Sequence, residues 1–156
     1  MSPRLFLLRV IEPGLSLLPN YMTSDAARVI LMAIAIQETN IAARAQIGGP
    51  ARGYWQFEFA GVEAVLKQTP SLAQAVLETC DIPLTSAAAA IEYNDPVACA
   101  FARLMLWSDA APLPPLTDTA GCYDYYQRNW RPGKPDESRW PSAFATAIST
   151  VSAEKQ

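Results

Sequence analysis

The chain has 156 residues, a formal net charge of −3, 51% hydrophobic residues and only 17% charged residues. This length allows one domain with a sizeable core, and the composition excludes a disordered chain. A negative net charge gives no electrostatic footprint for nucleic acid. The sequence also lacks histidine, which removes Ser-His and Cys-His nucleophile pairs and the commonest zinc ligand. We therefore expect no cofactor, no metal site and no nucleic-acid partner.

Residues 1 to 23 are expected to form an N-terminal arm. The segment contains three prolines and scattered leucines, which favour an irregular arm or short helix that packs on the core or on a partner. Its Leu5-Phe6-Leu7-Leu8 run is broken by Arg9 and Glu12 and followed by Pro13. Such a run makes a poor signal-peptide core, so we expect no signal peptide.

The three cysteines predict free thiols. Cys80, Cys99 and Cys122 are an odd number, lie far apart and fall in expected helices. This pattern is typical of buried thiols made in a reducing compartment rather than of a disulfide framework.

No apolar stretch reaches the roughly 18 residues that a membrane span requires, so we expect no membrane span.

The segment from Ala26 to Gln37 predicts a helix with protein on all sides. Thr23-Ser24-Asp25 supplies an N-cap, and apolar residues or alanines occupy every face of the helix except at Arg28. A helix that is apolar all round must be covered by other elements. We therefore expect residues 24 to 156 to form one mainly helical domain around this buried central helix.

Helical periodicity stops between Asn40 and Gly61. Gly48-Gly49-Pro50 and Gly53 mark turns, and the short aromatic segment Tyr54-Trp55-Gln56-Phe57 favours a small loop or β-hairpin lobe. After this lobe, caps and apolar periodicity predict further helices. They are expected at residues 61–68, 71–80, 85–93, 94–107, 118–129 and 140–151, with a proline-rich connector at 110–116.

Glu38 lies where the apolar run of the central helix ends. Burial disfavours the charged form of a carboxyl and raises its pKa, and a proton held near neutral pH can be donated to a leaving-group oxygen. We expect the stem of Glu38 to be buried and its carboxyl to open into a cleft shared with Gln56. The alternative is a helix-terminal glutamate that pairs with Arg44 or Arg52.

Glu58 follows the aromatic turn, twenty residues after Glu38 (58 − 38). Two carboxylates on either side of a cleft are the usual equipment for cleaving a glycosidic bond, so Glu58 is a candidate second carboxylate. The alternative is a solvated surface glutamate, which is the commoner fate of a lone glutamate after a turn.

Two aromatic segments are candidate substrate-binding regions. Tyr54, Trp55 and Gln56 offer rings that can stack on sugars and an amide that can bond their polar groups, although these rings can equally be core. In the segment 123–130, Tyr125 and Asn129 share the more polar helix face. Tyr123, Tyr126 and Trp130 share another face, for which packing is the simpler interpretation.

In this order, the motifs resemble those of the lysozyme-like superfamily, and most of all soluble lytic transglycosylases and goose-type lysozymes. The resemblance covers about residues 24 to 150 and rests on Glu38-Thr39, on Gly53-Tyr54-Trp55-Gln56 and on a late helix with tyrosines and Asn129. The family has serine where Thr39 stands and Leu-Met where Tyr54-Trp55 stand. Residues 46–53 and 129–135 look closer still to uncharacterised phage proteins found among virion genes.

The resemblance implies a lysozyme-like fold and cleavage of the β-1,4-glycosidic bonds of peptidoglycan. It implies that Glu38 protonates the glycosidic oxygen, that Gln56 lines the cleft, and that Tyr125 or Tyr126 with Asn129 orients the glutamate or the substrate. The expected setting is a virion whose proteins are made in the host cytoplasm, and the expected partners are glycan strands and other virion proteins. The alternative is a non-catalytic virion protein that keeps the scaffold for assembly.

Overall fold

The computed structural model describes residues 1–154 and is mainly helical. The N-terminal segment contains α1 (Pro3–Phe6), the π-helical turn η1 (Leu7–Ile11), α2 (Glu12–Ser16) and η2 (Asn20–Met22). Pro13 cannot donate to the helical hydrogen-bond ladder, and the wider π turn comes directly before it. The expected arm is thus largely helical. Phe6 and Ile11 are fully buried in the core, whereas Leu5 and Leu8 are exposed.

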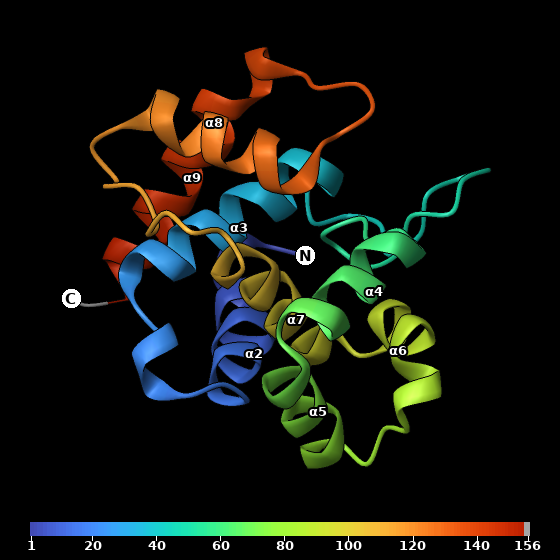
Figure 1. Ribbon diagram of the computed structural model, residues 1–156. Helices are drawn as coiled ribbons and strands as arrows, with labels where there is room; N and C mark the ends of the chain where they lie inside the picture. The colour runs from blue at the N-terminus through green and yellow to red at the C-terminus, as the bar shows by residue number, and fades with distance from the viewer. Residues whose placement is uncertain (155–156) are drawn as a thin grey trace.

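The central helix is α3 (Asp25–Thr39), whose start and end both have a local cause. The Ser24 side chain accepts a hydrogen bond from the Ala27 N–H, and Asn40 ends the helix in the left-handed conformation with φ 52°. Residues from Val29 to Ala35 are at most 1% exposed. Figure 1 shows α3 crossing the molecule beneath α8 and α9, and α3 packs against η1, α7 and α9.

The remaining helices follow the expected order with small shifts of their ends. They are α4 (Phe59–Gln68), α5 (Pro70–Thr79), η3 (Leu84–Ser86), α6 (Ala87–Tyr93), α7 (Asp95–Trp107), α8 (Thr119–Trp130), η4 (Glu137–Arg139) and α9 (Trp140–Ala153). Asn94 and Asp118 cap α7 and α8 through their side chains. In Figure 1, α4, α5 and α6 lie together at the lower right, and α8 and α9 lie at the upper left.

Between α3 and α4 the chain forms a non-helical lobe at residues 40–58. Its described residues form two isolated β-bridges, Ala45 with Arg52 and Arg52 with Phe57, and no regular strand. Gly48 lies in the turn between Ala45 and Arg52, and Gly53 and Gln56 lie in the turn between Arg52 and Phe57. All three adopt positive φ, as tight turns often require. Within residues 1–154, none of the helices is long and apolar enough to cross a membrane.

Candidate active site

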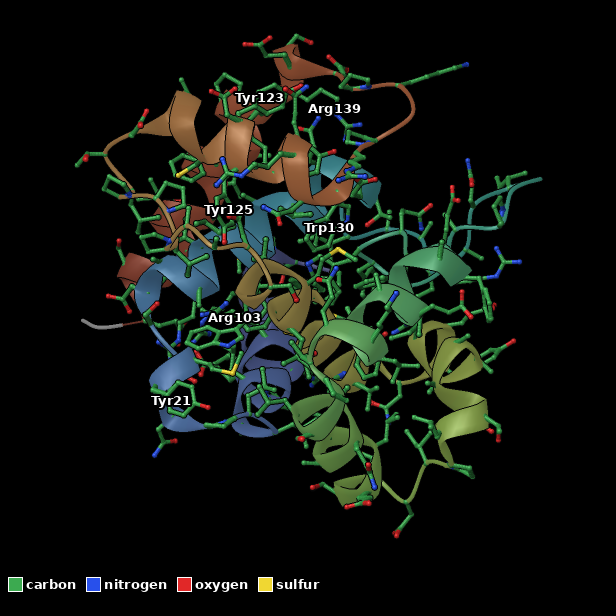
Figure 2. The ribbon with its side chains drawn as sticks, in the orientation of Figure 1. Tyr21, Arg103, Tyr123, Tyr125, Trp130 and Arg139 are labelled. Carbon is green, nitrogen blue, oxygen red and sulfur yellow. The ribbon has the colours of Figure 1, made fainter. Side chains whose placement is uncertain are left out.

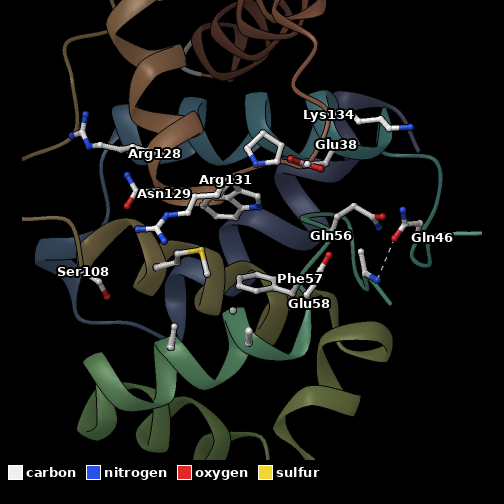
Figure 3. Close-up of a pocket in the computed structure, with 18 of the residues that line it drawn as sticks. Glu38, Gln46, Gln56, Phe57, Glu58, Ser108, Arg128, Asn129, Arg131 and Lys134 are labelled. Carbon is white, nitrogen blue, oxygen red and sulfur yellow. Dashed lines mark hydrogen bonds between the residues drawn. The ribbon is translucent and has the colours of Figure 1, made fainter. Parts of the chain in front are cut away.

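A cleft of about 930 Å³ lies between the end of α3, the non-helical lobe, α4 and the end of α8. Figure 3 shows Glu38 in the upper part of the view, with Asn129 and Arg131 to its left and Phe57 and Glu58 below it. The described lining combines carboxylates, amides and cations with apolar side chains. The volume of this hollow lies within the range of small-molecule sites.

Glu38 is the penultimate residue of α3 and is half-buried. The next residue fixes the helix end, because the Thr39 hydroxyl is within hydrogen-bond distance of the Ala35 carbonyl at 3.0 Å and of the Tyr54 carbonyl at 3.1 Å. This contact ties the last turn of α3 to the lobe. The contact fixes the backbone next to Glu38, and Glu38 itself lines the cleft.

The Tyr126 hydroxyl donates a hydrogen bond of 2.6 Å to Glu38 Oε1. The Tyr126 ring stacks on Trp140 with 5.3 Å between ring centroids and 9° between planes, which fixes the direction of the hydroxyl. Burial raises the pKa of Glu38, while the Tyr126 hydrogen bond and the Arg139 cation act in the opposite direction. The net pKa is raised, so burial is the stronger influence.

Arg139 is a member of this site that the sequence analysis missed. It belongs to η4, and its guanidinium donates a 3.3 Å hydrogen bond to the Ile36 carbonyl near the end of α3. A cation near the C-terminal end of a helix is favourable, and this one also lowers the pKa of Glu38. No local pattern in the sequence marks it, because its partner lies 103 residues away.

Two ion pairs overturn the alternative in which Glu38 pairs with Arg44 or Arg52. Arg44 lies 2.6 Å from Asp95, and Arg52 lies 3.0 Å from Glu92. Both arginines are therefore used to attach the non-helical lobe to α6 and α7. Within the described residues, the groups that act on the Glu38 carboxyl are Tyr126 and Arg139.

Gln56 and Glu58 both line the cleft with Glu38. Gln56 adopts φ 51°, and its amide donates to the Gly53 carbonyl at 2.9 Å, so the turn itself sets the position of this side chain. Glu58 is exposed at the start of α4. The structure thus brings together the two carboxylates and the amide that the sequence analysis selected.

Tyr54 and Trp55 lie in the core rather than on the cleft wall. Trp55 is fully buried, and its indole donates to the Leu31 carbonyl at 2.9 Å. Tyr54 is 4% exposed, meets Phe6 edge to face at 5.1 Å and lies under Arg44. The expected stacking of these two rings on sugars is therefore wrong, because the aromatic turn anchors the lobe to α3 and to the N-terminal segment.

The structure reverses the roles that the helix faces suggested for Tyr125 and Tyr126 of α8. Tyr125 is 2% exposed, and its hydroxyl donates to the Leu106 carbonyl at 2.7 Å, so it is a packing residue. Tyr126, on the face assigned to packing, reaches Glu38. Asn129 lines the cleft, and its amide donates to Asp109 and to the Tyr125 carbonyl, both at 2.8 Å.

No group of three or more histidine, cysteine, aspartate or glutamate residues in the described part of the chain is placed to hold a metal ion. Comparisons with protein-family models, with curated proteins and with solved structures give no match for this chain.

Proposed function

We propose that this chain is a lysozyme-like, virion-associated protein of a phage that cleaves the β-1,4-glycosidic bonds of peptidoglycan during cell-wall penetration. The observation that carries the activity is the environment of Glu38. Its carboxyl is half-buried, opens to a cleft of about 930 Å³ and has a raised pKa. A carboxyl whose pKa is raised keeps its proton to a higher pH than an ordinary glutamate and can donate it to the oxygen of a leaving sugar.

Two routes of cleavage are consistent with the cleft. In a lytic transglycosylase, Glu38 first protonates the departing glycosidic oxygen. The resulting carboxylate then takes the proton of the sugar's own 6-hydroxyl as that oxygen attacks the anomeric carbon, and the product has a 1,6-anhydro end. In a muramidase, water is the incoming group, and Glu58 is the carboxylate available to assist it. Gln56 and Asn129 supply amides for the hydroxyl and acetamido groups of the glycan.

The virion setting rests on the resemblance of residues 46–53 and 129–135 to phage proteins found among virion genes. The lysozyme-like assignment is supported by the helical class of the fold and by the position of Glu38 at the end of a buried helix beside a non-helical lobe. In this setting the protein works beside other virion proteins on glycan strands.

Glu38→Gln is the variant that tests the activity. The amide keeps the shape of the side chain and its ability to accept from Tyr126, but it has no proton to transfer. We expect release of soluble fragments from peptidoglycan sacculi to fall by about two orders of magnitude or more. Mass spectrometry of the products separates anhydro ends from reducing ends. Full cleavage by the Glu38→Gln protein would rule out the assignment.

A second candidate is a non-catalytic virion protein that keeps the scaffold for assembly. The burial of Tyr54 and Trp55 favours it, because these rings stabilise the lobe and do not bind substrate. Under this hypothesis the unmodified protein releases nothing from sacculi. Recovery of the protein from purified particles, with no activity in either form, would support this candidate.

A further inference from the structure

A second hollow, of about 570 Å³, lies between the end of α7, the start of α3 and the connector at residues 109–113. The described residues that line it are a different set from those that line the candidate active site. In the view of Figure 2, Arg103 lies between Tyr21 and Tyr125 in this region. The proposed function makes no use of this hollow.

Arg103 lines this hollow and is a buried cation with no carboxylate partner among residues 1–154. The residue is 4% exposed. Its Nε donates to the Met22 carbonyl at 2.9 Å, and its guanidinium lies 5.2 Å from the centre of the Trp107 ring. The ion pairs formed within residues 1–154 do not include it. Burying a charge is costly unless it is paired, so this site is incomplete electrostatically.

Asp109, the carboxylate on the wall of the hollow, already accepts hydrogen bonds from other groups. It accepts hydrogen bonds from Arg128 at 2.7 Å, from Asn129 at 2.8 Å and from the Ala111 N–H at 2.9 Å. The hydrogen bond from Arg128 is the main reason why the pKa of Asp109 falls to about 2. Its charge therefore balances Arg128 and leaves the charge of Arg103 unbalanced.

The rest of the lining is mostly apolar. Leu106, Trp107, Pro112 and Leu113 contribute to it, and proline has no N–H with which to bind a polar group. Trp107 is 43% exposed, and the exposed ring of Tyr21 lies 5.5 Å from it. The hollow thus combines one buried cation with an apolar surface and an aromatic rim.

We propose that this hollow binds a compact organic carboxylate with an apolar body. The carboxylate lies against the guanidinium of Arg103, whose planar fork matches the two oxygens, and the apolar body contacts Trp107 and Leu113. A free small acid and the C-terminal residue of a peptide share this chemistry. Binding supplies the counter-charge that no carboxylate of residues 1–154 provides beside Arg103.

The test uses a pair of probes that differ only in charge. N-acetyl-L-leucine has the carboxylate, and N-acetyl-L-leucinamide is its neutral match. A third probe, Gly-Gly-Leu, presents the same carboxylate at the end of a peptide. The reporter is the indole N–H signal of Trp107 in a ¹⁵N NMR spectrum, assigned with Trp107→Phe. The other indoles donate to Leu31, Trp55 and Thr119 carbonyls inside the protein.

We expect N-acetyl-L-leucine to shift the Trp107 signal saturably, with a dissociation constant of roughly 1 mM for a probe of this size. The neutral amide should bind about tenfold more weakly or not at all, because it lacks the charge-assisted bonds. Saturable binding of Gly-Gly-Leu points to a peptide terminus as the source, and binding of the free acid alone points to a small metabolite. Both results support the site.

Equal responses to the acid and the amide, or no saturation at about 20 mM of either, would overturn the proposal. Arg103→Gln should abolish the difference between the two probes, while Arg9→Gln, which removes an exposed cation elsewhere, should keep it. Should Arg103→Gln fail to fold, the probe pair on the unmodified protein still decides the question.

Discussion

At the scale of single residues, three influences compete on the carboxyl of Glu38. Burial raises its pKa, and the Tyr126 hydroxyl and the Arg139 cation lower it. Because the net pKa is raised, the carboxyl keeps its proton to a higher pH than an ordinary glutamate does. The hydrogen bond from Tyr126 has a second effect, because it fixes which way the carboxyl faces in the cleft.

Tyr126→Phe removes one of the two opposing influences and keeps the ring that stacks on Trp140. We therefore expect the pKa of Glu38 to rise further, as measured by ¹³C NMR titration of its side-chain carboxyl. In a sacculus assay, the alkaline limb of the pH–rate profile should move to higher pH by the same amount, because the protonated form of Glu38 is the acid in the proposed reaction.

Tyr123→Phe is the matched control for this experiment. It removes a phenol from the same helix, but the Tyr123 hydroxyl accepts from Gln127 and not from a group of the cleft. An unchanged titration of Glu38 in Tyr126→Phe, or an equal shift in both variants, would show that the hydrogen bond to Tyr126 does not set the acidity.

The raised pKa of Glu38 also predicts how stability depends on pH. The folded protein holds this proton more tightly than the unfolded chain, whose carboxyl has the ordinary value of 4.5. The resulting stabilisation is complete below that value and is lost as the pH rises through the pKa of the folded state. The stability of the Glu38→Gln protein does not change with pH in this way, because its amide does not titrate.

We expect the melting temperature of Glu38→Gln, relative to the unmodified protein, to increase from about pH 4 to about pH 8. Calorimetry at several pH values measures the difference. Glu58→Gln controls for the loss of one negative charge at the same cleft, because that side chain is exposed. A difference that is constant with pH would contradict the linkage to Glu38.

At the scale of elements, α2 and α7 pack closely against each other, and this contact positions part of the cleft wall. A Cβ on Gly14 would collide with the side chain of Cys99 and lie 2.8 Å from the Pro96 carbonyl. Only a residue without a side chain fits between the two helices. Their contact places α7, which contributes Met105 to the cleft wall.

Gly14→Ala should therefore destabilise the protein by about 1–3 kcal/mol through overpacking. Chemical denaturation measures this free energy of unfolding. Gly133→Ala is the matched control, since a Cβ at Gly133 meets nothing within 4 Å. A Gly14→Ala protein as stable as Gly133→Ala would mean that α2 and α7 can separate without cost.

At the scale of the whole molecule, the structure leaves Cys80, Cys99 and Cys122 as free thiols, as expected from their odd number. Cys99 and Cys122 are buried, and Cys80 is only partly so. Burial raises the pKa of all three thiols, that of Cys122 to about 11. Since the thiolate is the reactive form, all three should react slowly in the native protein.

We expect Cys80 to react first with a thiol reagent under native conditions and all three cysteines to react once the chain is unfolded. A reducing agent should leave the melting temperature unchanged, because no disulfide contributes to stability. Peptide mapping after labelling identifies the modified residue. Labelling of Cys99 ahead of Cys80 would show that the core opens more readily than the structure indicates.

The sequence by itself determined the helical class, the buried central helix and the ends of most other helices. These features depend on interactions within about four residues, such as the Ser24 cap, the Asn94 cap and the apolar positions of α3. The same local patterns selected Glu38, Gln56, Glu58 and Asn129, which the structure gathers around one cleft.

Only the tertiary structure decided which groups act on one another. Tyr126 reaches Glu38 across 88 residues, and Arg139 reaches the end of α3 across 103. The burial of Trp55 and the position of Arg103, which donates to the Met22 carbonyl, likewise depend on contacts between distant segments of the chain. Periodicity shows which side of a helix is apolar, but the partner of that side depends on how the helices pack. The acidity of Glu38 and the unbalanced charge of Arg103 are therefore properties of the assembled fold.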